Sequence, residues 1–371
     1  MSIAVTFLEQ GKQSAADIGA LLAEFMAGAR SSLHVAIYDC RLSDEVSAPI
    51  LKVLGERAAA GVDVRIVYDS GKPANPMAAG ADPAPPGTAA FMKRIVGTVG
   101  TKAITGGHAR NPRLMHHKYV IRDGKSAAGA VWTGSANFTD DSWTLQENNI
   151  VRIESTELCG FYETDFEELW TRGDIDTTGT QDHGSVRAGD SVIGVMFAPG
   201  DGRIIDHDVA ERIGTARRRL KICSMLITSG SILGALGDTL HRGRIAQYGG
   251  LYDRTQMESV FDQWRGTPVE WKIAAFQQIA AGLAGKRSTP YSPSSTHDFM
   301  HNKVMVVDDT VITGSYNLSH SATENAENVV MIQDRELADR YDAYIDGLVG
   351  RYRDTNHGST PMSTETSPMR Q

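Results

Sequence analysis

Residues 115–123 read MHHKYVIRD and residues 300–308 read MHNKVMVVD, so the pattern H-x-K-x4-D occurs twice in this chain. Each copy is followed by a second pattern, G-S-x-N, at residues 134–137 and 314–317. Either pattern alone arises freely by chance. Two matched pairs in the same order, with the histidines 185 residues apart, indicate two homologous halves that contribute to one shared reaction centre.

The repeat extends beyond these motifs. Ten residues after each motif asparagine comes Glu-Asn, at residues 147–148 and 327–328. Upstream, the apolar run LHVAIY at residues 33–38 has a counterpart, LKICSM, at residues 220–225. A repeat of this length is the size of a domain, whereas solenoid repeats are about 20–50 residues long. The sequence therefore predicts a duplicated domain.

The paired motifs resemble those of the phospholipase D superfamily, and the resemblance covers most of the chain. It implies an α/β fold of two tandem homologous α/β/α sandwich domains, with the active site at their interface. A stretch rich in Gly, Asp, Thr and Ser provides the expected boundary between the domains. The predicted division is a first domain at residues 1–172, a linker at 173–190, a second domain at 191–354 and a disordered tail at 355–371.

Local patterns also predict alternating strands and helices. Residues 33–38 and 62–68 are expected to be strands on either side of a helix at 46–60. The β-branched runs at 119–121 and 304–307 are expected to place each motif His and Lys on a strand. Strands interleaved with helices are typical of an α/β sandwich.

Two insertions interrupt the internal symmetry, at residues 71–87 and 256–295. The first is rich in Pro, Ala and Gly, and the second contains helical segments with several aromatic residues. Both precede the histidine-bearing strands. They are expected either to border the substrate entrance or to be ordinary surface structure, and the sequence leaves both alternatives open.

The bulk composition is typical of a globular protein with two domains. The chain has 371 residues, of which 41% are hydrophobic and 22% charged, and single cores stop growing at about 250–300 residues. Three cysteines are too few and too scattered for a disulfide framework. No stretch reaches the roughly 18 apolar residues of a membrane helix, and the N-terminus does not resemble a secretory signal. We expect a cytoplasmic protein without a transmembrane segment, for which peripheral membrane contact and oligomeric state stay open.

The charge balance bears on the substrate. The formal net charge is −8, whereas proteins that bind nucleic acid usually carry a basic surface patch. The basic run at residues 217–219 is expected on the solvated outer face of a helix rather than in a phosphate-binding patch. The balance favours a lipid or a small diester over a polynucleotide.

The resemblance implies roles for the motif residues in phosphodiester chemistry. His116 resembles the nucleophile and His301 the general acid and base, although the symmetry of the motifs alone leaves this choice open. Lysine ammoniums and asparagine amides would stabilise the charge on the phosphoryl oxygens of the transition state. The four residues expected to do so are Lys118, Lys303, Asn137 and Asn317.

Six further residues are expected to support this centre. The resemblance implies that Glu147 and Glu327 each hold the far nitrogen of an imidazole, as the carboxylate of a catalytic triad does. Ser135 and Ser315 are expected to add hydroxyl donors to the site. The resemblance also implies that Asp123 and Asp308 stabilise the fold and lie away from the phosphorus atom.

No metal and no cofactor are expected. His297 and His301 have a spacing that suits zinc on a helix, but His301 begins a strand and no third ligand lies nearby in the sequence. His117 lies between two site positions on a strand, so it is expected to point to the opposite face. His108 lies on a predicted loop and is interpreted equally well as a pocket residue or as an ordinary exposed residue.

The predicted function is that of a phospholipase D-like phosphodiesterase, a hydrolase that acts through a phosphohistidine intermediate. The favoured substrate is a phospholipid, whose head group is released to leave phosphatidic acid. The main alternative is a metal-independent endonuclease of the same superfamily. A phosphatidyltransferase and a non-catalytic phosphate-binding scaffold are the remaining hypotheses.

Overall fold

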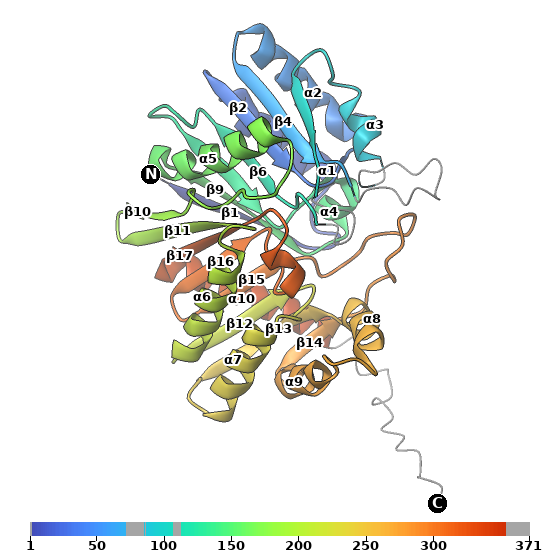
Figure 1. The fold of residues 1–371 in the computed structure, drawn as a ribbon, viewed down its shortest axis with the longest axis vertical. Coiled ribbons are helices and arrows are strands. Elements are labelled where there is room, and N and C mark those ends of the chain that lie inside the picture. Colours follow the sequence, from blue (N-terminus) through green and yellow to red (C-terminus); the bar gives the residue numbers. More distant parts are fainter. Residues whose placement is uncertain (1, 72–84, 86, 107–112, 354–371) are drawn as a thin grey trace, which may run out of the picture.

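The computed structural model describes residues 2–71, 85, 87–106 and 113–353. The predicted tail, most of the 71–87 insertion and His108 therefore lie outside the described residues. Figure 1 shows two halves stacked along the long axis of the molecule, each with its own sheet and flanking helices. This arrangement confirms the predicted α/β fold class.

The first half is built on a seven-stranded mixed sheet in the order β1-β9-β7-β6-β2-β4-β5. Its strands are β1 (Ile3–Leu8), β2 (Ser32–Ile37), β4 (Asp63–Asp69), β5 (Gly100–Ile104), β6 (Lys118–Arg122), β7 (Ala130–Gly134) and β9 (Asn148–Glu154), with β3 (Cys40–Arg41) and β8 (Phe138–Thr139) paired separately. Its helices are α1 (Ala15–Ala27), α2 (Asp44–Ala59), α3 (Thr88–Met92), α4 (Asp140–Thr144) and α5 (Thr156–Arg172).

The second half is built on an eight-stranded sheet in the order β10-β11-β17-β16-β15-β12-β13-β14. Its strands are β10 (Gly184–Ala188), β11 (Ser191–Ala198), β12 (Arg219–Ser224), β13 (Gln247–Asp253), β14 (Leu283–Lys286), β15 (Lys303–Val307), β16 (Thr310–Gly314) and β17 (Glu327–Gln333). Its helices are α6 (Gly202–Thr215), α7 (Gly230–His241), α8 (Arg254–Trp264), α9 (Trp271–Ala280), the 3-10 turn η1 (His320–Thr323) and α10 (Arg335–Arg353).

The sheets bury apolar side chains on both faces because successive strand residues point to opposite sides. In β2, Val35 packs into the core under α1 and α2, whereas its neighbour Ala36 packs into the core that contains α5. This second core continues into the other half, because it also contains residues of β11, β17 and α10. The two central helices, α5 and α10, thus lie in a layer that the two sheets share.

Aromatic rings close the junction between the halves. Phe7 of β1 stacks on Tyr344 of α10 with ring centroids 4.2 Å apart. On the other side, Tyr162 of α5 meets Phe197 of β11 edge-on at 5.0 Å. Apolar side chains of both halves therefore pack against each other at this junction. Among the described residues, no helix combines the length and apolar character needed to cross a membrane.

Three local predictions need correction. The stretch at 173–190 is not a linker throughout, because it contains β10, which pairs with β11 and buries Val186 in the shared core. The motif histidines precede their strands, which begin at the lysines of the motifs. The basic run at 217–219 is not on a helix, because α6 ends at Thr215 and β12 begins at Arg219.

Candidate active site

Each motif histidine is anchored by the backbone of the opposite half. The N–H of His116 donates to the carbonyl of Ala326 at 2.8 Å, and the N–H of His301 donates to the carbonyl of Glu147 at 3.1 Å. These contacts belong to two isolated β-bridges, Met115 with Ala326 and Glu147 with Met300. The histidines are therefore held where the halves meet.

Two buried aspartates fix the residue before each histidine. Asp69, the last residue of β4, accepts the N–H of Met115 at 2.8 Å. Asp253, the last residue of β13, accepts the N–H of Met300 at 2.9 Å. Sequence analysis did not select these two residues. They could have been predicted from their positions, because each is the last residue of a parallel strand and the two strands are equivalent in the repeat.

The lysines lie beside the histidines because residues i and i+2 of an extended chain share a face. Lys118 Nζ donates to the carbonyl of His116 at 2.7 Å, and Lys303 Nζ donates to the carbonyl of His301 at 2.8 Å. Lys303 Nζ also lies 3.3 Å from His301 Nε2. The Tyr38 ring flanks the site, 4.7 Å from the His116 ring and 5.2 Å from Lys118 Nζ.

Burial and mutual repulsion weaken the positive charge of this group in the absence of an anion. Burial lowers the pKa of Lys118 to about 7, against the opposing charge of Glu327. Burial and the Lys118 charge lower the pKa of Lys303 well below its usual value. Burial, followed by the two lysine charges, lowers the pKa of both His116 and His301. Such a cluster favours binding of an anion, which would stabilise the protonated forms.

The asparagines of the two G-S-x-N motifs have unpartnered oxygens. Among the described residues, Asn137 Oδ1 and Asn317 Oδ1 are buried without a hydrogen-bond partner. An amide oxygen only accepts hydrogen bonds, so the group of each asparagine that could donate to a phosphoryl oxygen is Nδ2. The glycine of the first motif lets the backbones of β7 and β9 lie close together. A Cβ at Gly134, where φ is +142°, would lie 2.2 Å from the carbonyl oxygen of Asn149.

Glu327 has the contact expected of it. Its Oε2 lies 2.8 Å from His116 Nδ1, and its side chain is fully buried. Burial raises the pKa of Glu327 to about 7, against the Lys118 charge and a hydrogen bond from Ser315. A carboxylate at Nδ1 leaves His116 Nε2 as the free nitrogen.

The prediction that Glu147 holds the other imidazole is wrong. His301 Nδ1 lies 3.1 Å from Asn148 Oδ1 instead. The strand register explains the difference. Gly134 pairs with Ile150 and Gly314 pairs with Val329, so the residues two positions earlier, Asn148 and Glu327, are structurally equivalent.

The equal spacing of the two Glu-Asn pairs in the sequence therefore aligns the wrong residues. The connection before β9 contains α4, which has 5 residues, whereas the connection before β17 contains η1, which has 4. A shift of one residue along a strand moves each side chain to the opposite face. Glu147 is thus equivalent to Ala326, in agreement with the carbonyl contacts that the two residues make to the histidines.

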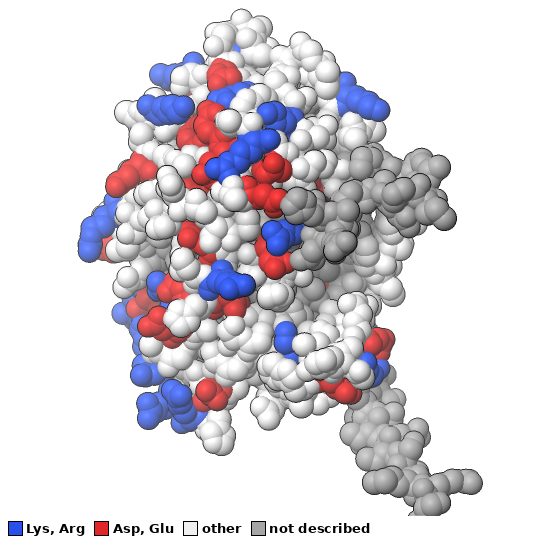
Figure 2. All heavy atoms as spheres, viewed as in Figure 1, with Lys and Arg blue, Asp and Glu red and all other residues white. Residues whose placement is uncertain are grey.

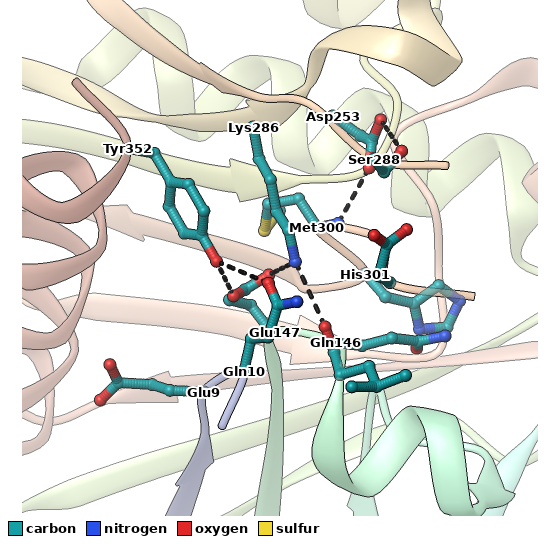
Figure 3. Close-up of polar contacts among 12 residues, drawn as sticks. Glu9, Gln10, Gln146, Glu147, Asp253, Lys286, Ser288, Met300, His301 and Tyr352 are labelled. Atoms are coloured by element: carbon teal, nitrogen blue, oxygen red, sulfur yellow. Dashed lines mark hydrogen bonds and ion pairs between the residues drawn. The ribbon is translucent and has the colours of Figure 1, made fainter. Parts of the chain in front are cut away.

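Glu147 is instead the centre of a buried polar cluster that joins the halves (Figure 3). Its Oε2 accepts from Lys286 Nζ of β14 at 2.6 Å, and both side chains are at most 2% exposed. Its Oε1 accepts from the Tyr352 hydroxyl of α10. Lys286 was missed by sequence analysis because it lies in the 256–295 insertion and its counterpart by strand register in the first half is Ile104.

The motif serines do not supply free donors, which corrects a second expectation. The Ser135 hydroxyl donates to Asn148 Oδ1 at 2.7 Å and accepts from the N–H of Asn149. The Ser315 hydroxyl accepts from the N–H of Asn328 at 2.9 Å and is hydrogen-bonded to Glu327. Both hydroxyls therefore position the group that holds the imidazole.

The motif aspartates lie away from the histidines. Asp123 has a φ of +53° and accepts the backbone N–H groups of residues 30–32, and Asp308, with a φ of +51°, accepts those of residues 217–219. Each aspartate thus fixes the turn that enters the strand beside the motif, β2 or β12. This placement agrees with the bracing role that the resemblance implies.

The remaining histidines lie outside the reacting group. His117 is fully buried on the opposite face, 3.3 Å from Asp165 Oδ2. His297 Nε2 lies 2.9 Å from the carbonyl of Ser292, and its Nδ1 lies 3.3 Å from Arg41 Nη2. In the described part of the chain, His, Cys, Asp and Glu side chains form no group of three that could hold a metal ion.

Comparisons with known proteins show the family of this chain. The family model described as "Cardiolipin synthase, PLD-like domain" matches residues 22–170 and 209–349, which together are more than half of the chain. The chain is 31% identical over 153 residues to a phospholipase D of Rickettsia bellii, and the match covers 41% of this chain and 66% of that protein. It is 28% identical over 149 residues to a mitochondrial cardiolipin hydrolase of Xenopus laevis, covering 40% of this chain and 59% of that protein.

The chain thus spans less than two thirds of either relative. Among solved structures, a phosphatidylserine synthase of Haemophilus influenzae superposes with a TM-score of 0.64, 94% of this chain and 85% of that chain covered, and 12% identity. At that identity the likeness supports the fold alone. The family match to both halves shows that this chain belongs to the phospholipase D superfamily, in the family of cardiolipin synthase, PLD-like domains.

Proposed function

We propose that this protein is a phosphodiesterase that hydrolyses a phospholipid head group through a phosphohistidine intermediate and leaves phosphatidic acid. The observation that carries the proposal is the buried cluster of His116, Lys118, His301 and Lys303, in which each motif is anchored by the opposite half. A phosphodiester anion would supply the negative charge that this cluster lacks.

The reaction would proceed in two steps. His116 Nε2 attacks phosphorus and the P–O bond to the leaving alcohol breaks, while protonated His301 gives its Nε2 proton to the leaving oxygen. A water molecule then gives a proton to His301 and attacks phosphorus, which breaks the P–N bond and releases His116. Lys118, Lys303, Asn137 and Asn317 would stabilise the charge on the phosphoryl oxygens in both steps.

Three observations favour a lipid over a polynucleotide. The net charge is −8, and on the face in Figure 2 Lys and Arg are interspersed with Asp and Glu rather than gathered in a stripe. The basic run at 217–219 is also partly neutralised, because Arg219 pairs with Asp339 at 2.6 Å and with Asp342 at 3.2 Å. Binding of a polynucleotide depends on Lys and Arg that neutralise several phosphates.

The experiment that tests the proposal is a substrate panel with millimolar EDTA present. It compares phosphatidylcholine and cardiolipin vesicles, bis-p-nitrophenyl phosphate and plasmid DNA, each with wild type and His116→Ala. We expect phosphatidic acid or another phosphomonoester from a lipid, and none from the variant. Cleavage of DNA alone would support the endonuclease, and transfer of the phosphatidyl group to added alcohol without hydrolysis would support the transferase.

Two further outcomes would contradict the proposal. Phosphate binding without turnover of any substrate would support a scaffold. Activity that EDTA abolishes and that Mg²⁺ or Zn²⁺ restores would replace the histidine mechanism with metal-ion catalysis.

A further inference from the structure

We infer that the tip at residues 265–271, which joins α8 to α9, docks the protein on the surface of a zwitterionic phospholipid bilayer by inserting Val269 and Trp271. This docking rests on the proposed function, since it names the surface on which that reaction would meet its lipid. It would give the 256–295 insertion a role that its counterpart in the first half does not share.

Exposed apolar side chains concentrate in this insertion. Val269 is 36% exposed, Trp271 54% and Tyr291 60%, and all three lie between residues 256 and 295. In the described part of the chain, the other large apolar side chains that are exposed, Val96 and Ile204, each lie on a different segment. Single exposed apolar residues need no explanation, whereas a group of them marks a contact surface.

The tip protrudes from the molecule and has an ordered backbone. All seven of its residues are exposed, so it forms no groove that could enclose a partner helix or peptide. Its conformation is fixed by three turns. In them the N–H of Thr267 donates to the carbonyl of Trp264, that of Glu270 to Thr267 and that of Lys272 to Val269, at 3.0–3.1 Å.

The N–H groups of the tip have acceptors within or next to the tip itself. Besides those turns, the N–H of Gly266 donates to Glu270 Oε2 at 3.3 Å, and the N–H of Val269 donates to Thr267 Oγ1 at 3.4 Å. Pro268 has no N–H to satisfy. A backbone N–H that leaves water without an acceptor costs free energy, so these bonds lower the cost of moving the tip into a less polar interface.

The side chains at the tip suit the head-group region of a bilayer. Tryptophan is enriched there, because its ring is apolar and its N–H can still reach a polar partner. Val269, two residues earlier, adds an aliphatic side chain to the same tip. A protein partner would instead be expected to hold an anchoring ring in a matching pocket.

The charges of the insertion favour an uncharged surface over an anionic one. Residues 256–295 contain four Lys and Arg and three Asp and Glu, which gives +1, whereas the whole chain carries −8. Arg265 of the tip is paired with Asp262, and Lys272 Nζ donates to the carbonyl of Thr228 at 2.9 Å. Anionic membranes are typically bound by clusters of about 4–8 Lys and Arg, which these seven residues do not contain.

The tip lies one helix length from the reaction centre. α8 begins directly after Asp253, which accepts the N–H of Met300 beside His301. Its 11 residues span about 16 Å, less than the roughly 20 Å of one bilayer leaflet. Tyr291 adds an exposed ring that stacks on His297 at 5.4 Å, and in Figure 1 α8 and the segment after β14 lie on the same side of the molecule. A lipid at the docked surface would thus be about its own length from His301.

Vesicles of dibrominated phosphatidylcholine test the docking directly, because bromine quenches tryptophan fluorescence only at short range. We expect the full-length protein to sediment with these vesicles and to lose fluorescence. Trp271→Ser should bind about 10-fold more weakly or less, from the apolar area that it no longer buries. Trp271→Phe keeps an apolar ring, so it should sediment nearly as wild type does but lose most of the quenching.

Ile204→Ser is the matched control, because Ile204 is 56% exposed on α6 and lies outside the insertion. It should change neither sedimentation nor quenching. Because apolar insertion carries the binding, added salt should have little effect, and anionic lipid should not strengthen it.

Turnover gives a second readout. At limiting lipid, Trp271→Ser should hydrolyse phosphatidylcholine vesicles about 10-fold more slowly, in line with its weaker binding. Hydrolysis of bis-p-nitrophenyl phosphate, which is soluble, should be the same in this variant and in wild type, since Trp271 is outside the reacting group.

Three outcomes would overturn the docking surface: wild type that neither sediments with the vesicles nor is quenched, Trp271→Ser that binds as tightly as Ile204→Ser, or binding that requires anionic lipid. A dimer in light scattering that Trp271→Ser dissociates, without vesicle binding, would assign the tip to a second copy of this chain instead. Failure of the proposed function is distinguishable, because sedimentation and quenching need no turnover. A protein that docks through Trp271 but hydrolyses no phospholipid would keep the docking surface and refute the proposed reaction.

Discussion

At the scale of single residues, the main feature of the site is a group of basic side chains whose pKa values are lowered by burial. Two lysines and two histidines are buried together, and burial moves the pKa of each toward the neutral form. A bound phosphodiester reverses this effect, because a negative charge within about 4–6 Å favours the protonated lysines. Substrate binding and proton uptake should therefore be coupled.

Lys118 gives this coupling a pH at which it can be measured. Its pKa is lowered to about 7 by burial, so the ammonium is present below that pH and is lost as the pH rises through it. We expect kcat/KM, which reports the free enzyme, to fall above that pH while kcat falls at a higher pH. Lys118→Arg, which stays charged, should remove this contribution. An alkaline limb that is the same in wild type and Lys118→Arg would contradict the assignment.

The two histidines should act as a unit. We expect His116→Ala and His301→Ala each to reduce turnover by about 10⁴-fold or more, and the double variant to be scarcely worse than either, since residues of one catalytic group are strongly non-additive. Steady-state kinetics with circular dichroism as the folding control would measure this. Additive losses, or substantial turnover in one folded single variant, would mean that the halves do not share one centre.

Sequence patterns identified the motif residues of this site but not all the contacts between them. His116, Lys118, His301 and Lys303 could be predicted because they recur in short patterns. Asn148 could not, because the first-half connection is one residue longer, and this offset is visible only in the strand register. Lys286 has no counterpart in the repeat, so its contact with Glu147 depends on the tertiary structure.

At the scale of elements, β14 supplies the lysine that neutralises Glu147, and α10 supplies the tyrosine that donates a hydrogen bond to it. Lys286 comes from the edge strand of its sheet and Tyr352 from the last turn of the C-terminal helix. The helix and strands predicted from the sequence are present as α2, β4, β6 and β15, where the apolar periodicity is strong. The prediction failed at β10, because its alternation is short and lies among residues typical of loops.

The ion pair between Lys286 and Glu147 should be costly to break on one side. Lys286→Met leaves a fully buried carboxylate uncompensated, and we expect a loss of about 3–5 kcal/mol in the free energy of unfolding. The double variant Lys286→Met with Glu147→Gln should recover much of that loss, since it removes both charges. Urea denaturation would measure both effects. If Lys286→Met were as stable as wild type, solvent would have to compensate the charge of Glu147 in place of the lysine.

At the scale of the whole molecule, the halves are two copies of one fold that share an apolar core. The core between the sheets contains side chains of α5, α10, β11 and β17, and each histidine is hydrogen-bonded to the backbone of the other half. Inter-domain contacts within a chain usually resemble transient interfaces and permit relative motion. A continuous apolar core does not, so the reacting groups are held at a fixed separation.

This shared core predicts one cooperative unfolding transition for the whole chain. The tryptophans allow the halves to be followed separately, since Trp264→Phe with Trp271→Phe leaves only those of the first half, Trp132, Trp143 and Trp170. We expect the fluorescence transition of this variant in urea to coincide with its far-ultraviolet circular dichroism transition, which reports both halves. Coincident transitions with different probes are the mark of two-state behaviour. Two separated midpoints would mean that one half unfolds while the other persists, and the shared centre would then depend on a docking equilibrium rather than on a single core.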